Sequence, residues 1–177
     1  MLVSTSFVVG LSVASLLLNL AFGYLAGSTA KESLMTYYGC GTILYFMHYV
    51  GHKRWIPWWY LSHVFGHHRQ SYPPERFTSD TYVVNTYDVY GIGTWIYVLP
   101  AALYACAMRS WSVWWHLCMI MLLNNYLHAQ IHLTHSWWSK SVWFQQLQHL
   151  HKNHHKFPCN YAVHDFTLDV LFGKFKF

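Results

Sequence analysis

The chain has 177 residues, of which 54% are hydrophobic, 20% aromatic and only 10% charged. The length is that of one domain. So few charges cannot cover a water-soluble globule, in which about 25% of residues are charged, so the composition favours a membrane protein over a soluble chain with a large obligate interface. The net charge of +5 does not indicate a nucleic-acid partner, because the basic residues lie among Trp, Tyr and His without a nucleic-acid motif; an anionic membrane surface is the expected counterpart.

Four apolar segments are candidates for membrane-spanning helices. Residues 5–27 carry no charge and are long enough to cross a hydrocarbon core of about 30 Å. No Lys or Arg precedes them, which favours a retained helix over a signal peptide. A short polar link leads to the second segment, residues 35–52. The third and fourth, residues 89–108 and 111–132, are joined by about two residues and form a predicted helical hairpin.

The basic residues predict an orientation for these helices. If all four span, the ends that bear histidine fall on one side of the membrane, and only Lys31 and Arg109 lie on the other. The histidine side carries nine of the eleven basic residues: Lys53, Arg54, Arg69, Arg76, Lys140, Lys152, Lys156, Lys174 and Lys176. The positive-inside rule makes that side cytoplasmic. We therefore predict an all-α integral membrane protein, a single domain over residues 1–177, with about four transmembrane helices and a cytoplasmic, histidine-rich cap of short helices.

Ten of the fourteen histidines fall into four spaced groups. The groups are His48-x-x-x-His52, His63-x-x-x-His67-His68, His128-x-x-x-His132 and His151-x-x-His154-His155. Residues three or four apart share one face of a helix, about 5–6 Å apart, so two imidazoles of a group can converge on one ion. The doubled His-His pairs offer a second ring turned by about 100°, which can reach another ion.

The number and type of these side chains predict two metal ions. Imidazole suits zinc, copper, iron and nickel, and a structural zinc needs only about four ligands, so ten histidines exceed one site. The Glu-x-x-His pairs of carboxylate-rich di-iron bundles are missing from the sequence. The pattern indicates a nearly all-nitrogen site, and residue types alone do not separate iron from zinc. His116, His135, His149 and His164 stand outside the pattern, and the four cysteines show no paired spacing.

The histidine groups, in this order and with this hydropathy, resemble those of the fatty acid hydroxylase/sterol desaturase superfamily. The resemblance extends to a trailing Asn160-Tyr161-Ala-Val163 and an Asp169-Val-Leu-Phe172-Gly173 stretch. It covers residues 35–177, leaving 1–34 as an N-terminal transmembrane helix and link, and is nearest in pattern to the sphingolipid fatty acid hydroxylase type. The first group has three intervening residues where that type often has four. The second has three where two are usual, which turns His63 by about 100° on an α-helix.

The resemblance implies a function and a ligand set. The implied activity is that of a membrane-bound di-iron monooxygenase that hydroxylates a lipid (fatty acyl, sphingolipid or sterol) with O2. It implies electrons from a separate donor, a b-type cytochrome or a ferredoxin with its reductase, and a location in the endoplasmic reticulum if eukaryotic or the inner membrane if bacterial. Zinc can occupy the same sites in a purified sample. The implied metal ligands are His48, His52, His63, His67, His68, His128, His132, His151, His154 and His155, with no catalytic residue beyond the metal centre.

Three other functions stay open at this point. A desaturase uses the same scaffold. A zinc-dependent membrane hydrolase of amides or esters needs about three histidines and a carboxylate, and a non-catalytic metal or haem carrier does not require the C-terminal stretch. Asn160, Asp165 and Asp169 are expected either to orient ligand rings or to act as capping and turn residues.

Overall fold

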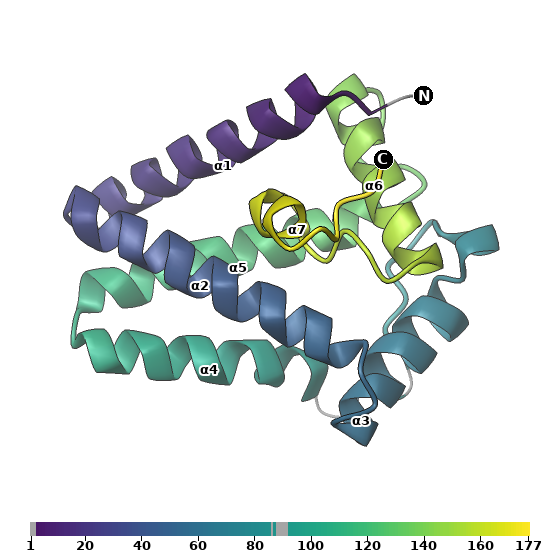
Figure 1. The fold of residues 1–177 in the computed structure, drawn as a ribbon, viewed down its shortest axis with the longest axis horizontal. Helices are drawn as coiled ribbons and strands as arrows, with labels where there is room; N and C mark the ends of the chain where they lie inside the picture. The colour runs from purple at the N-terminus through teal and green to yellow at the C-terminus, as the bar shows by residue number, and fades with distance from the viewer. Residues whose placement is uncertain (1–2, 86, 88–91) are drawn as a thin grey trace.

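The computed structural model describes residues 3–85, 87 and 92–177, the side chains of residues 92–97 and 101 excepted. Every regular element in this part of the chain is helical (Figure 1). The elements are α1 (Thr5–Leu25), α2 (Ala30–Gly51), α3 (Pro57–Tyr60), the π-helix η1 (Leu61–Ser71), the 3₁₀-helix η2 (Pro74–Arg76), α4 (Ile92–Met108), α5 (Trp111–Ile131), α6 (Val142–Lys156) and α7 (Thr167–Leu171). The predicted all-helical class is confirmed.

The four long helices follow the predicted apolar segments, with one difference at the start of α2. This helix begins at Ala30, five residues before the predicted position, because Thr29 and Glu32 form a capping box. The Glu32 amide donates to the Thr29 hydroxyl at 3.2 Å, and the Thr29 amide donates to the Glu32 carboxylate at 2.8 Å. Such a pair satisfies amides that the first helical turn leaves free. Residues 89–91 of the third predicted helix lie outside the described residues.

The long helices run back and forth between two ends of the molecule. Figure 1 shows the α1–α2 and α4–α5 turns at one end and the π-helix with α6 at the other. Lys31 lies in the first turn of α2 and Arg109 in the α4–α5 turn, so both are at the end opposite the histidine groups. Helix α2 packs against α1, α4 and α5, and α5 also contacts α1 and α6.

Two clusters of buried apolar side chains hold these helices together. One joins α2, α4 and α5, and consists of Cys40, Ala105, Val113, Leu117, Ile120 and Met121. The other joins α6 to the N-terminal turn of α1 and to the C-terminal segment, and consists of Val3, Val8, Phe77, Ile131, Phe144, Leu147, Leu150, Val163 and Phe166. The second cluster brings the segment after α6 back between α1 and α2, where α7 lies in Figure 1.

Among the described residues, only α1 is long and apolar enough to cross a membrane by length and composition. A shorter apolar stretch, Val98–Met108, lies in α4. Helices α2 and α5 have the required length, but their tyrosine, tryptophan, asparagine and histidine side chains lower the hydropathy without adding formal charge. The structure therefore shows one candidate span where the sequence predicts about four.

A buried polar joint connects α1, α2 and α5 near the end opposite the histidine groups. His116 is fully buried, and its Nε2 lies 2.5 Å from the Asn19 side-chain oxygen. The Asn19 amide nitrogen donates to the Ser33 carbonyl at 3.3 Å. The approach of α1 to α2 is close here, since a Cβ on Gly23 would overlap the Ser33 side chain. His116, which lies outside the spaced groups, thus has a role in helix packing.

The substitution Asn19→Leu should destabilise the protein by about 1–3 kcal/mol, because it leaves both ring nitrogens of buried His116 without a partner. Thermal denaturation in detergent measures this effect. The matched control is His135→Ala, since the His135 side chain is 83% exposed and its loss should change stability by no more than about 0.5 kcal/mol. Equal stability of the two variants would contradict the proposed joint.

Candidate metal centre

The fold gathers nine of the ten predicted ligands into two groups. Within each group, one ligand nitrogen from every histidine lies within 4.8 Å of the others. The first histidine group is His48, His52, His63, His68 and His154. The second histidine group is His67, His132, His151 and His155. The tenth histidine, His128, lies beside the second group, its ring centroid 4.9 Å from those of His67 and His151.

The doubled histidines divide between the two groups as predicted. His67 belongs to the second group and His68 to the first, while His154 belongs to the first and His155 to the second. The groups adjoin, because the rings of His68 and His155 stack with their centroids 3.9 Å apart. Two neighbouring positions on one helix therefore contribute to two neighbouring histidine groups.

The π-helix explains how His63 joins the first group despite its spacing. A π-helix closes hydrogen bonds between residues five apart, one more than an α-helix. His63 and His68 are five apart in η1 and lie on the same side, with their Nε2 atoms 3.1 Å apart. The predicted rotation of His63 away from the site assumed an α-helix. The wider turn absorbs the extra residue and returns His63 to the site.

Four ligand rings are oriented by backbone carbonyls. The Nδ1 atoms of four histidines lie within hydrogen-bond distance of a carbonyl oxygen: His48 of Tyr161 (2.5 Å), His154 of Cys159 (2.7 Å), His155 of Tyr72 (2.8 Å) and His132 of Phe77 (3.0 Å). A carbonyl can only accept, so Nδ1 must carry the proton and donate. The lone pair is then on Nε2, the atom that faces the other rings, which is how proteins prepare a histidine for a metal ion.

The backbone that supplies the carbonyl for His48 is itself fixed. The Asp169 carboxylate accepts from the amides of Tyr161 and Ala162 at 2.8 and 2.9 Å, and so holds the backbone that receives His48. Asp169 therefore orients a ligand through the backbone, without touching its ring.

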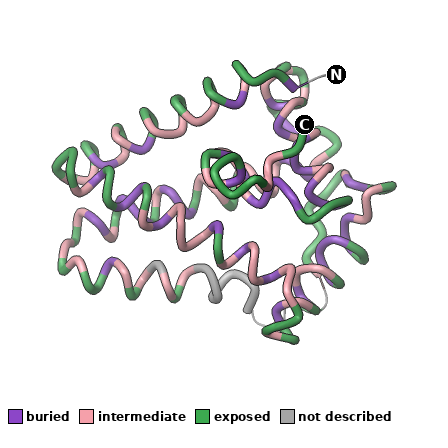
Figure 2. Tube along the Cα trace, in the orientation of Figure 1, coloured by how far each residue is buried: buried purple, intermediate pink, exposed green. Residues whose placement is uncertain are grey.

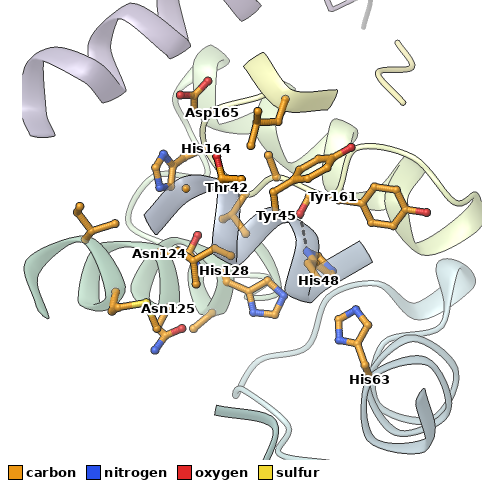
Figure 3. Close-up of a pocket in the computed structure, with 18 of the residues that line it drawn as sticks. Thr42, Tyr45, His48, His63, Asn124, Asn125, His128, Tyr161, His164 and Asp165 are labelled. Atoms are coloured by element: carbon orange, nitrogen blue, oxygen red, sulfur yellow. Dashed lines mark hydrogen bonds between the residues drawn. The ribbon is translucent and has the colours of Figure 1, made fainter. Parts of the chain in front are cut away.

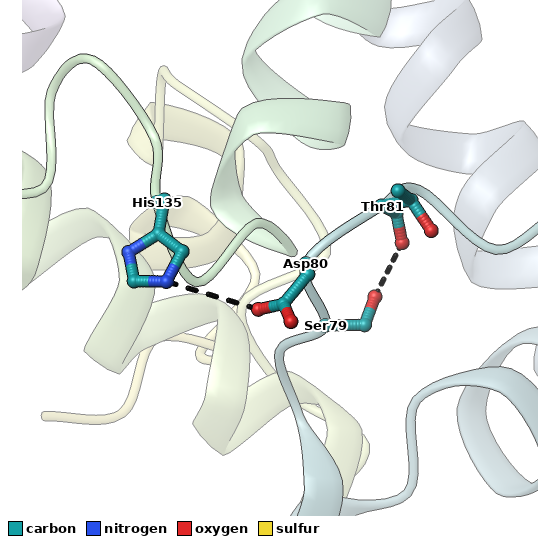
Figure 4. A network of polar contacts seen from close by, with 4 residues as sticks. All are labelled: Ser79, Asp80, Thr81 and His135. Atoms are coloured by element: carbon teal, nitrogen blue, oxygen red, sulfur yellow. Dashed lines mark hydrogen bonds and ion pairs between the residues drawn. The ribbon is translucent and has the colours of Figure 1, made fainter.

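The loop after η2 is pinned in a similar way, beside the carbonyl that receives His132. The Ser79 amide donates to the His132 carbonyl at 3.0 Å, and the Thr134 amide donates to the Ser79 carbonyl at 2.9 Å. Figure 4 shows the surface side of this loop, where Asp80 faces His135 at 3.9 Å. Both of these side chains are 83% exposed, so the ion pair contributes little to stability.

Several buried ring nitrogens have no hydrogen-bond partner within the described part of the chain. They are the Nε2 atoms of His48, His67, His132 and His155, and both ring nitrogens of His151. A buried polar atom without a partner costs about 1–3 kcal/mol, and such atoms are rare in folded proteins. Their convergence within each group is the arrangement expected of ligands for a cation.

The distances in the first group suit an ion with more than four ligands. Nε2 of His52 lies 3.1 Å from Nε2 of both His63 and His154. Two nitrogens bound at about 2.1 Å stand about 3.0 Å apart at right angles and about 3.4 Å apart in a tetrahedron. The observed separations are nearer to the right-angle value. In the metal-free protein, each such contact requires one of the two rings to carry its proton on Nε2.

The surroundings of these rings favour the neutral form that binds metal. Burial lowers the pKa of His154 to about 3, although its bond to the Cys159 carbonyl acts in the opposite direction. Burial, reinforced by repulsion from neighbouring histidines, also places the pKa values of His67, His68 and His151 well below 6.5. These imidazoles are uncharged at neutral pH and need lose no proton to bind an ion.

A cavity of about 390 Å³ opens beside the two histidine groups, between α2, α5 and the C-terminal segment (Figure 3). Its wall at the metal end includes His48 and His63 of the first group and His67 of the second. Tyr45, Tyr161 and Trp59 also line it. A small molecule held in this space would therefore lie against ligands of both groups.

The remaining candidates lie away from the converging nitrogens. Asn160 donates to the Leu150 and Lys176 carbonyls and so joins α6 to the C-terminal residues. The Cys159 thiol lies 3.8 Å from the Asn153 carbonyl. His164 and Asp165 line the far end of the cavity (Figure 3). The sequence did not predict the four backbone carbonyls that orient His48, His132, His154 and His155. Every residue has a carbonyl, so these positions carry no signal in the sequence.

Comparison with family models, curated proteins and solved structures finds no match to the chain. The candidate site therefore stands on the geometry of the described residues, and the resemblance in the histidine spacing remains a hypothesis about function.

The first test of the site is its metal content. Purified protein should contain about two ions per chain, and His154→Ala or His151→Ala should each reduce this to about one, because each removes a ligand from a different group. Mass spectrometry of the elements measures the content. His149→Ala is the matched control, since His149 is on the same helix but in neither group. Retention of two ions in His154→Ala and His151→Ala would refute the two-site arrangement.

The second test is the pH dependence of stability in the metal-free protein. The folded-state pKa values of these histidines lie below the unfolded value of about 6.5, so at acid pH the unfolded chain binds more protons than the folded chain. Stability is therefore full above about pH 6.5 and declines as the pH falls below it. Each histidine protonated only on unfolding contributes about 1.4 kcal/mol per pH unit. Thermal denaturation between about pH 8 and 5 measures this, and a constant or rising unfolding temperature toward acid would contradict the assignment.

Proposed function

We propose that this protein is a membrane-bound oxygenase that uses a pair of metal ions, two irons, to hydroxylate a lipid. The observation that carries the proposal is that two adjacent groups of buried histidines border the same cavity, which lies between α2 and α5. The spacing of the histidines and the C-terminal stretch, which resemble those of the fatty acid hydroxylase/sterol desaturase superfamily, give the reaction class.

The outer faces of the long helices support a membrane location. On α1, the side chains of Val9, Val13 and Leu17 are at least half exposed, and on α4 those of Leu99 and Leu103 are more than half exposed. Figure 2 shows exposed positions recurring along the outer side of α1. Contiguous apolar surface of this extent indicates contact with lipid or with another protein. With α1 as a candidate span, we assign these faces to the lipid of an integral, multi-pass protein whose histidine end is cytoplasmic.

Iron is the metal that we propose for the two groups. Five imidazoles in the first group, and four with His128 adjacent in the second, exceed the four ligands of a tetrahedral zinc. When bound, a redox-active metal pair supplies the oxidising power toward O2 and an unactivated C–H bond that side chains lack. The electrons come from a separate donor protein, a b-type cytochrome or a ferredoxin with its reductase.

The residues of the chain position the substrate and keep the site dry. Buried Trp59 and Tyr161 form part of the cavity wall beside the ligands. Ile120 and Met121 of α5 contribute apolar surface to the same wall. An alkyl chain in this space is held by apolar contact, which favours it over water, and one of its carbons faces the histidine groups.

The donor set favours this function over a zinc hydrolase. A hydrolase of amides or esters needs a carboxylate or similar base at the metal-bound water. Among the described residues, the two groups contain only histidine. The Asp169 carboxylate, which supports the backbone beside His48, is already engaged by two backbone amides. A desaturase on the same scaffold remains the second candidate, because it needs the same ligands and the same cavity.

Lipid profiling by mass spectrometry tests the proposal after expression in a host without such an activity. We expect a host lipid to gain one oxygen atom, and His155→Ala to lower the product by about 100-fold or more. His149→Ala should retain full activity. Loss of two hydrogens from the lipid would identify the desaturase instead, and full activity of His155→Ala would refute a metal-centred reaction.

A further inference from the structure

The cavity has a second, polar end away from the histidine groups, formed by Tyr37, His164 and Asp165. Tyr37 precedes the ligand His48 by eleven residues on α2, which corresponds to about 16 Å of helix. In Figure 3, His164 and Asp165 lie on the opposite side of the cavity from His63. The polar end and the metal end therefore bound one continuous space, and a long molecule can touch both.

The carboxylate at the polar end is held in one position by three elements. One oxygen of Asp165 accepts from the Ser12 hydroxyl of α1 at 2.8 Å, and from the Thr167 hydroxyl and amide at 2.6 and 3.0 Å. The Tyr37 hydroxyl of α2 donates to the other oxygen. Burial raises the pKa of this carboxyl, but the donated hydrogen bonds outweigh burial and lower the pKa below its ordinary value. Asp165 is an oriented anion at neutral pH.

The polar end of the cavity offers no lysine or arginine to an anionic ligand. None of the described residues that line it is lysine or arginine. Between the two ends, the wall consists of apolar side chains such as Leu44 and Ile120, with the uncharged polar side chains of Thr42 and Asn124. A carboxylate or phosphate placed beside Asp165 would be an unpaired charge facing a like charge, which is strongly unfavourable. A group that donates a hydrogen bond finds an ionised acceptor there, and such bonds are strong.

We propose that Tyr37, His164 and Asp165 form a head-group subsite for an uncharged lipid head that donates a hydrogen bond, an alcohol or an amide, and that this subsite rejects carboxylate and phosphate heads. The inference rests on the proposed function for the identification of the cavity as a lipid site. It deepens that function by naming the chemical class of the substrate.

The length of the cavity also determines which carbon faces the metals. Tyr37, whose hydroxyl donates to Asp165, is about 16 Å along α2 from His48. Several bonds of an alkyl chain therefore separate a head group at Asp165 from the histidine groups. The carbon presented to the histidine groups is therefore in the interior of the alkyl chain. Carbons next to the head group remain near Tyr37 and Thr42, away from the ligands.

Binding of two lipids of equal length tests the subsite directly. Metal-loaded protein in a non-ionic detergent is titrated with labelled hexadecanol and labelled hexadecanoate at about pH 8, where hexadecanoate is ionised. We expect hexadecanol to bind at least about tenfold more tightly, because like-charge contact opposes the carboxylate. Equal affinity, or tighter binding of hexadecanoate, would overturn the proposal.

Two variants alter the charge of the subsite. Leu168 lines the cavity three residues after Asp165, and Leu168→Lys should shift the preference toward hexadecanoate by at least about tenfold, since it supplies the missing cation. Val170→Lys is the matched control, because Val170 is on the same helix, 56% exposed and not among the cavity residues. Asp165→Asn, which keeps the size of the side chain, should bring the two affinities together. An unchanged preference in the folded variants would overturn the subsite.

The binding assay separates failure of this inference from failure of the proposed function. Lipid binding needs no oxygen or electrons, so a preference for hexadecanol without any oxidised product supports the subsite and counts against the oxygenase. Oxidation of a lipid without head-group preference supports the oxygenase and overturns the subsite. Where product forms, we expect its oxygen on an interior carbon, located by fragmentation in the mass spectrometer. Oxygen beside the head group would overturn the subsite.

Discussion

Each imidazole ring has two nitrogens, and both need a hydrogen-bond partner or a metal ion when the ring is buried. The protein atoms around the histidine groups supply a partner for only some of these nitrogens. In this chain, four rings each satisfy Nδ1 with a backbone carbonyl, which turns Nε2 toward the other rings. Neutral rings that face each other through lone pairs repel or remain unsatisfied, whereas a cation satisfies several at once. Under the proposed function, folding of the histidine end and metal binding are coupled, because each ion would stabilise the folded state in which its ligands converge.

The rest of the fold can be understood from this requirement. The π-helix brings His63 and His68 to one side, although they are five residues apart. The segment after α6 returns to the bundle, and Asp169 holds its backbone so that the Tyr161 carbonyl meets His48. The long helices act as a frame whose ends carry ligands. Two stretches of non-α backbone, the π-helix η1 and the segment after α6, lie beside the histidine groups. π-Helical turns are frequent at functional sites, and backbone carbonyls commonly orient histidine ligands.

Under the proposed function, the cavity connects the histidine groups to the lipid of the membrane. Its wall passes from ligands of both groups, along α2 and α5, to the carboxylate of Asp165. The outer faces of α1 and α4 expose apolar side chains, and under the proposed membrane location a lipid substrate would reach the cavity from a medium of low polarity. In the proposed complex, the head group of the lipid would bind at Asp165 and its alkyl chain would extend toward the metal pair. This arrangement would hold one carbon of the chain beside the metals, as selective oxidation of a single carbon requires.

Residue order alone determined the helical class, the approximate bounds of the long helices and the four histidine groups, because helical periodicity and composition are local properties. It also indicated that the paired histidines divide between two groups, since adjacent residues on a helix point about 100° apart. Only the tertiary structure decided that His63 joins the first group, because the π-helix depends on packing at η1. The carbonyl anchors and the polar end of the cavity were likewise decided by tertiary structure. They join segments far apart in the chain through backbone groups or a single carboxylate, and such contacts leave no pattern in the sequence.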